Sequence, residues 1–199
     1  MTPRSFVQLV YRMPAKPTAG RVAVWRHLKK AGAVYLQDSV CVLPDTEQTR
    51  NELEPVLQRI DESDGGSYHL LPLAELPAAE ETKLVQLFVD QTTKHYAEIV
   101  EDCEVNFVKE IEFENFRENY TYEEAEEIRM EYEKICTWFE RVQERDWFSA
   151  PNQGEARGWL RRCESLLEEF EAKVFELQGG DGDVERRAHL RAVSDKDAS

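Results

Sequence analysis

Hydrophobic and polar positions in the first third of the chain follow the patterns of short strands and amphipathic helices. Apolar and polar side chains alternate along residues 5–11 (SFVQLVY), which include β-branched valines, and this predicts a strand. Val24, Leu28 and Ala31 recur at helical spacing, which predicts a helix. The expected elements are a strand at 5–11, a helix at 18–31, a hairpin from 33–36 and 40–43, a helix at 46–64 and a strand at 68–73. This β-α-β-β-α-β order predicts an α+β, ferredoxin-like domain over residues 1–76.

The rest of the chain has the periodicity of long helices. Apolar positions recur at alternating steps of three and four residues in three stretches: 77–103, 121–142 and 153–177. Thr121 and Glu124 have the spacing of a capping box. We expect an acidic helical domain over residues 77–178, folded as a long antiparallel bundle or hairpin, with the segment 104–119 either helical or irregular. The glycine-rich, polar residues 179–199 predict a disordered tail.

Charge divides the chain in the same way. Residues 1–75 carry nine basic and nine acidic side chains, so the net charge of −15 lies entirely in residues 76–199. Residues 1–44 alone hold seven basic groups and one acidic group, Asp38. The overall charge excludes a uniformly basic nucleic-acid coat but leaves room for a local basic patch.

The strongest functional signal in this pattern is a group of four cations on the first predicted helix, beside Trp25. They are Arg21, Arg26, Lys29 and Lys30. One interpretation is an outer face that only keeps the protein in solution. The other is a site for an oxyanion or a nucleic-acid phosphate, for which arginine supplies bidentate hydrogen bonds.

Motifs for common enzyme chemistry are missing. The chain has no GxSxG, no GxxxxGK[ST] and no GxGxxG. We therefore expect no catalytic residues and no cofactor, and an enzyme is the less favoured class.

A metal site is the main alternative. His95 and Glu98 are three residues apart on one predicted helix, and Glu101 and Asp102 follow one turn later. In so acidic a chain the same spacing arises on a solvated helix face held by pairs four residues apart, which we favour. We interpret Glu110, Glu112 and Glu114 in the same way.

The four cysteines (Cys41, Cys103, Cys136 and Cys163) are too far apart in sequence for a zinc knuckle or a CxxC motif. We interpret them as reduced core residues, with reaction of a thiol with an oxidant as the minor alternative. No apolar run approaches the length of a membrane span or of a secretory signal, so we expect a soluble, cytoplasmic protein without a membrane partner.

Two motifs resemble one known family. Residues 14–44, PAKPTAGRVAVWRHLKKAGAVYLQDSVCVLP, combine a PxxP loop, an RVxVWRxL helix, a GA turn and a strand pair ending in VLP. This pattern is similar to the N-terminal region of the chromate resistance protein ChrB family. The later run Arg141-x-x-x-Arg145-Asp146-Trp147-Phe148 resembles that family's second signature. The resemblance extends over about residues 5–178.

The resemblance implies a module of a regulator of a chromate efflux operon. Full-length members carry a further C-terminal domain, which would begin near the end of this chain, so we expect a stand-alone N-terminal module. The first domain also looks similar to the Cas2-like ferredoxin fold of phenylacetate-type repressors. Cas2 nucleases end the first strand in a metal-binding Asp, whereas this chain has Val10-Tyr11-Arg12, which argues against nuclease chemistry.

Three functional hypotheses follow. The first is a non-enzymatic regulatory or interaction module whose basic helix contacts DNA phosphate or an oxyanion such as chromate, with the helical domain mediating self-association or partner binding. The second is a metal-binding or redox enzyme that uses His95, Glu98, Asp102 and a cysteine. The third is a structural partner that binds another protein through the helical domain.

Overall fold

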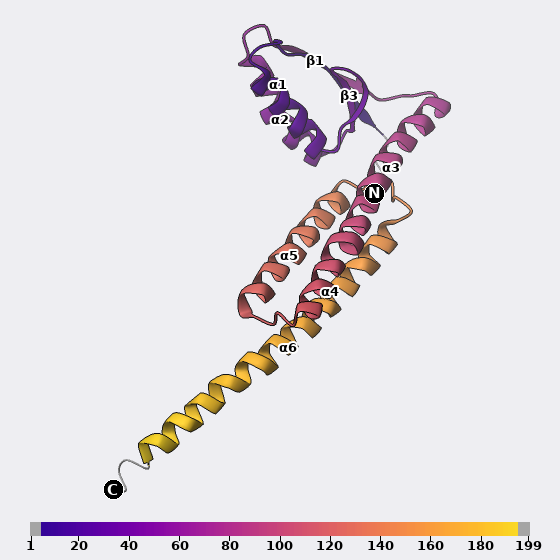
Figure 1. Ribbon diagram of the computed structural model, residues 1–199. Helices are drawn as coiled ribbons and strands as arrows, with labels where there is room; N and C mark the ends of the chain where they lie inside the picture. The colour runs from indigo at the N-terminus through magenta and orange to yellow at the C-terminus, as the bar shows by residue number, and fades with distance from the viewer. Residues whose placement is uncertain (1–4, 195–199) are drawn as a thin grey trace. The chain divides into compact units, whose positions relative to one another are not determined.

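The computed structural model describes residues 5–194, with side chains described up to residue 179. The chain folds into two compact units (Figure 1). Of the described residues, the first unit comprises 5–94 and 143–150, and the second comprises 95–142 and 151–194. The expected mixed α+β class is confirmed, since a four-stranded antiparallel sheet is combined with a larger number of helical residues.

The first unit is built on that sheet. Its elements follow the chain as β1 (Phe6–Arg12), α1 (Thr18–Lys30), β2 (Val34–Gln37), β3 (Val40–Pro44), α2 (Glu47–Asp61) and β4 (Ser67–Leu73). The strands lie in the order β2-β3-β1-β4, and every neighbouring pair is antiparallel. Leu9 in the central strand β1 is paired with Cys41 of β3 and with Leu70 of β4. The strands and helices predicted for this part of the sequence are therefore present in the predicted order.

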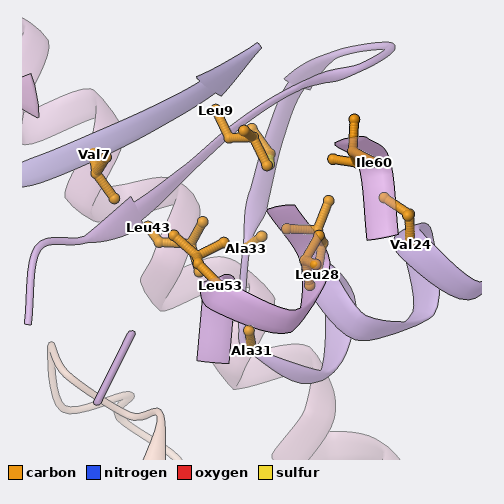
Figure 2. Close-up of a cluster of buried hydrophobic side chains, with 11 residues drawn as sticks. Val7, Leu9, Val24, Leu28, Ala31, Ala33, Leu43, Leu53 and Ile60 are labelled. Atoms are coloured by element: carbon orange, nitrogen blue, oxygen red, sulfur yellow. The ribbon is translucent and has the colours of Figure 1, made fainter. Parts of the chain in front are cut away.

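One face of the sheet packs on α1 and α2, which run side by side (Figure 1). Alternation along the strands sends Val7, Leu9 and Leu43 to this face, and Figure 2 shows them meeting Leu28 of α1 and Leu53 of α2. Val24, Leu28 and Ala31, the predicted stripe of α1, are all buried. Each fully buried aliphatic side chain contributes about 1.5–3 kcal/mol to stability, so this cluster fixes α1 firmly on the sheet.

The other face of the sheet packs on aromatic residues from distant parts of the chain. Phe6 of β1 stacks with Phe88 of α3 (Ala78–Glu101) at 6.0 Å between ring centroids, and with Phe148 at 6.1 Å. Trp147 meets Phe88 edge to face at 5.9 Å. The first unit thus includes the first part of α3 and residues 143–150, which lie outside the expected range 1–76, because these aromatic side chains bury the second face of the sheet.

The second unit is helical. After α3 the chain continues through a π-helical segment, η1 (Asp102–Phe107), into α4 (Val108–Arg117), so most of the segment 104–119 is helical. Glu118, with φ 54°, ends α4 in the left-handed conformation. The predicted cap of α5 (Tyr122–Glu144) is confirmed, since the Glu124 backbone N–H donates to Thr121 Oγ1 at 3.1 Å. Helix α6 follows as Gln153–Ser194.

The core of the second unit is formed by large side chains from α3, η1, α5 and α6. Tyr96, Phe107, Phe139 and Phe170 are all nearly inaccessible to solvent. Of the tail predicted at 179–199, residues up to Ser194 belong to α6 and residues 195–199 lie outside the described part of the chain. Among the described residues, no helix has both the length and the apolar character needed to cross a bilayer.

Candidate functional site

A cavity of about 700 Å³ opens on the first unit where three segments meet. These segments are the end of β1, the exposed side of α1 and the turn between β2 and β3. The turn is held against β1 because the Tyr11 backbone N–H donates to the Ser39 carbonyl oxygen at 2.9 Å. The sheet register and the β-α-β connection therefore build the cavity.

Three cationic side chains and one carboxylate line this cavity. Arg12 lies at the end of β1, Arg21 and Lys29 lie on α1, and Asp38 lies in the turn between β2 and β3. Arg12 and Arg21 are exposed. None of the ion pairs found among the described residues involves either arginine or Lys29. The cavity therefore has a surplus of positive charge that is available to an anion.

Lys29 lies deeper than the two arginines. Its Nζ lies 5.2 Å from the centre of the Tyr35 ring and donates a hydrogen bond to Gln91 Oε1 at 3.4 Å. Burial of the side chain lowers the pKa of Lys29 below its ordinary value. A bound anion would restore the preference for the charged ammonium group, so binding of an anion and protonation of Lys29 favour each other.

Two tyrosines from neighbouring segments line the same cavity. The Tyr11 and Tyr35 hydroxyl oxygens are 3.0 Å apart and share a hydrogen bond. Burial raises the pKa of both phenols, so both stay protonated across the physiological range. The pair therefore contributes neutral O–H groups and no negative charge.

An indole completes the site. Trp25 lines the cavity, and 49% of its surface is exposed. Because Arg21, Trp25 and Lys29 are spaced four residues apart, α1 presents them on one face. An exposed aromatic ring between two cations is a surface on which an apolar or aromatic part of a ligand would pack.

Only two of the four cations that the sequence analysis assigned to an anion site line the cavity. Arg21 and Lys29 line the cavity, whereas Arg26 and Lys30 are exposed on α1 and do not line it. No ion pair among the described residues involves Arg26 or Lys30, so all four remain part of a positively charged surface.

Sequence reasoning missed the contributions of Arg12, Asp38 and the two tyrosines. In the sequence, Arg12 stands out only because it occupies the place of a carboxylate, and Asp38 only because it is the single acidic group among residues 1–44. The signal that would have found them is positional: in a β-α-β unit the end of the first strand lies beside the start of the helix.

The second sequence motif supports the end of α1. The Arg145 guanidinium donates to the Lys30 carbonyl oxygen at 2.9 Å, and Trp147 lies over Gly32. Both Asp146 carboxylate oxygens accept hydrogen bonds from the Ala150 backbone N–H, at 2.9 and 3.2 Å. Arg145 and Trp147 therefore support the end of the helix that carries the cavity's cations, and Asp146 stabilises the segment from which they come.

The residues of the alternative metal site are placed differently. His95 and Glu98 are half-buried on α3, and Asp102 begins η1. Among the described residues, the group of three or more potential metal ligands that lie together is a different one: Glu110, Glu114 and Glu124, whose oxygens are within 4.8 Å of one another.

The expectation of a solvated face was wrong for Glu114, which is only 2% exposed, and correct for Glu110 and Glu112. The reason is local hydrogen bonding. Arg117 Nη1 donates to Glu114 Oε1 at 3.2 Å, and Asn119 Nδ2 donates to Oε2 at 2.6 Å. Burial, followed by the charge of Glu114, raises the pKa of Glu124. Glu114 thus joins the end of α4 to the following turn.

Comparison with known proteins supports the motifs described above. A family model described as "Protein ChrB, N-terminal" matches residues 21–180, which is most of the chain and includes the part of α1 that carries both of its cavity cations. A search of curated proteins finds no significant match.

Proposed function

We propose that this chain, which belongs to the ChrB N-terminal family, is a non-enzymatic regulatory or interaction module that binds a tetrahedral oxyanion group in the cavity beside Trp25. The group is either a phosphate of DNA or a free oxyanion such as chromate. The observation that carries the proposal is a set of three cations around one concave surface, Arg12, Arg21 and Lys29, none of which has an ion-pair partner among the described residues. The family's description supports a role related to chromate resistance.

Charge and hydrogen bonding support this ligand class. Two guanidinium groups supply planar pairs of N–H donors, and the Lys29 ammonium supplies a compact charge. Asp38, the one carboxylate in the lining, offsets only part of this charge. A tetrahedral oxyanion group, whether a DNA phosphate or free chromate, accepts several such hydrogen bonds at once.

The size of the cavity favours a phosphate that is carried by a larger molecule. At about 700 Å³ it is in the range of sites for whole small molecules, roughly 300–1,000 Å³, and is much larger than a single tetraoxyanion. Trp25 offers a surface for the sugar or base next to a phosphate. We therefore favour DNA over free chromate as the ligand, with Arg26 and Lys30 reaching neighbouring phosphates.

The detailed fold, the cellular role, the location and the self-association of the chain are part of the same proposal. The ferredoxin-like (Cas2-like) assignment of the first unit is supported by its β-α-β-β-α-β element order. Transcription regulation, a cytoplasmic location and self-association through the helical unit are predictions that the family resemblance supports.

Fluorescence anisotropy with a labelled DNA duplex tests the proposal. The pair of substitutions Arg21→Ala and Lys29→Ala removes two cavity cations, and the matched pair Arg26→Ala and Lys30→Ala removes two cations of the same helix outside the cavity. We expect the cavity pair to weaken binding by at least about tenfold and to reduce the salt slope by roughly 1.8, the value for two phosphate contacts. The outer pair should have a smaller effect.

Calorimetric titration with inorganic phosphate and with chromate separates the two sources of the oxyanion. Binding of DNA alone supports the DNA form of the proposal, and binding of a free oxyanion supports the other. Equal loss of DNA affinity for the two variant pairs, without binding of either free anion, would rule out the cavity as the site.

A further inference from the structure

The second unit contains a group of thiols that the proposed anion site does not use. Cys103 in η1 and Cys163 in α6 are completely buried, and Cys136 in α5 is half-buried. The remaining cysteine, Cys41, belongs to the first unit. The described structure contains these residues as free thiols.

The backbone at Cys103 departs from regular helix. The chain changes from α-helix to the π-helical segment η1 at Asp102, one residue before Cys103, and returns to α-helix at Val108. Such segments cost stability and occur frequently at functional positions. Here η1 packs against α6, the helix that carries Cys163.

The two buried thiols interact directly. A hydrogen bond between them raises the pKa of Cys103 and lowers the pKa of Cys163, so Cys163 is the thiol that ionises first. Burial and the nearby Cys136 and Asp102 oppose this lowering of the Cys163 pKa. Arg162, the neighbour of Cys163 in the chain, adds to it, and the net shift is downward. One thiolate stabilised by a second thiol is the arrangement in which a sulfur nucleophile has its resolving partner at hand.

We propose that Cys103 and Cys163 are a disulfide-forming pair that responds to two-electron oxidants of the peroxide class. The Cys163 thiolate attacks one peroxide oxygen, the O–O bond breaks, and the departing oxygen leaves as water after taking up a proton, which gives a sulfenic acid. The Cys103 sulfur then attacks the Cys163 sulfur, the S–O bond breaks, and the hydroxyl group leaves as a second water with the Cys103 proton. Two thiols are oxidised, and one peroxide is reduced to two waters.

The disulfide would join η1 to α6 covalently. It would restrict the unfolded chain and so raise the thermal stability of the helical unit. Cys136 is the competing partner, but Tyr132 engages its thiol in a hydrogen bond. We therefore assign the pairing to Cys103 and Cys163.

Oxidation of the full-length chain with hydrogen peroxide, and in parallel with diamide, tests the pairing. Alkylation of the remaining thiols in denaturant, followed by peptide mapping, identifies the linked residues. We expect monomeric protein that has lost two hydrogen atoms, one linked peptide pair containing Cys103 and Cys163, and a higher unfolding temperature that a reductant reverses. Free glutathione in the same solution shows that enough oxidant was present.

Serine variants of single cysteines test which two residues form the disulfide. If a variant fails to fold, the peptide map of the wild-type protein still identifies the linked pair. Cys103→Ser and Cys163→Ser should each abolish the intramolecular link, whereas Cys41→Ser should leave it intact. A link that involves Cys136, a link only between two chains, or four alkylated cysteines after glutathione is fully oxidised would each overturn the proposal.

Discussion

Trp147 lies directly over Gly32. A β-carbon built on Gly32 would come within 2.8 Å of the Trp147 ring carbon Cη2 and 3.0 Å of Cζ3. Gly32 also has φ 81°, a left-handed conformation that favours glycine. Gly32, two residues after the end of α1, therefore has two reasons to be glycine, and one of them comes from a tryptophan more than a hundred positions away in the chain.

Replacement of this glycine should strongly destabilise the first unit. Gly32→Ala adds left-handed strain of about 1–2 kcal/mol and an overpacking cost of about 1–3 kcal/mol against Trp147. We expect the free energy of unfolding to fall by about 2–5 kcal/mol, the sum of these two costs, in urea denaturation followed by circular dichroism. Gly65→Ala is the matched control, because Gly65 has φ 78° with no atom near its β-carbon position, and it should lose only the strain. Equal losses for the two variants would refute the role given to Trp147.

The buried carboxylate of Glu114 should make Asn119 important for stability. Asn119→Ala removes the donor to Oε2 and leaves that oxygen without this bond in a buried place, at a cost of about 1–3 kcal/mol. Asn106→Ala removes a hydrogen bond from an exposed side chain in the same unit and should cost less than about 0.5 kcal/mol. Chemical denaturation of both variants measures the difference, and a small effect at Asn119 would mean that Glu114 is satisfied without it.

Alkaline pH should destabilise the first unit through Cys41. Burial raises the pKa of the Cys41 thiol from 9.0 to about 12, so between these values the unfolded chain loses a proton that the folded chain keeps. Stability therefore falls as pH rises through this window, by roughly 1.4 kcal/mol per pH unit for one retained proton. Denaturation between pH 9 and 12 should show a shallower fall for Cys41→Ala than for the wild type. Parallel pH profiles would remove Cys41 as a cause.

Removal of the one carboxylate in the cavity should tighten anion binding. Asp38→Asn removes the negative charge that opposes Arg12, Arg21 and Lys29, and we expect DNA or phosphate affinity to rise by about two- to fivefold, the effect of roughly 0.4–1 kcal/mol from an exposed charge. Asp61→Asn on α2 changes the net charge equally but does not line the cavity. If calorimetry gives the same gain for both variants, the effect comes from net charge and not from the cavity.

Local pattern predicted the parts of the fold that are set by local burial. The apolar stripe of Val24, Leu28 and Ala31 marks the side of α1 that faces the core, and the alternation along residues 5–11 does the same for β1. Both elements could therefore be predicted from the sequence. Periodicity does not encode which elements cover a sheet. The contacts of Phe88 and Phe148 with Phe6, and of Trp147 with Phe88, therefore could not be predicted.

Only the part of the candidate site that lies on one helix could be predicted, because periodicity reports on a single element and not on how elements meet. Arg21 and Lys29 share a helix, and helical spacing placed them together. Arg12 and Asp38 join them only because the register of β1 against β3 brings a strand end beside a turn. Glu114 shows the opposite limit. It belongs to a run of glutamates at alternate positions, which predicts a solvated face, and the hydrogen bonds from Arg117 and Asn119 account for its burial.

The most direct test of the anion site follows single residues during titration. Proton–nitrogen correlation spectra of the isotope-labelled full chain, recorded as a DNA duplex or sodium phosphate is added, report on the Trp25 indole N–H and on the backbone amides around the cavity. The account predicts saturable shifts at Trp25, at Arg12 and at the turn containing Asp38, which disappear with Arg21→Ala and Lys29→Ala. Shifts confined to Arg26, Lys30 and other surface cations, with Trp25 and the turn unchanged, would contradict it.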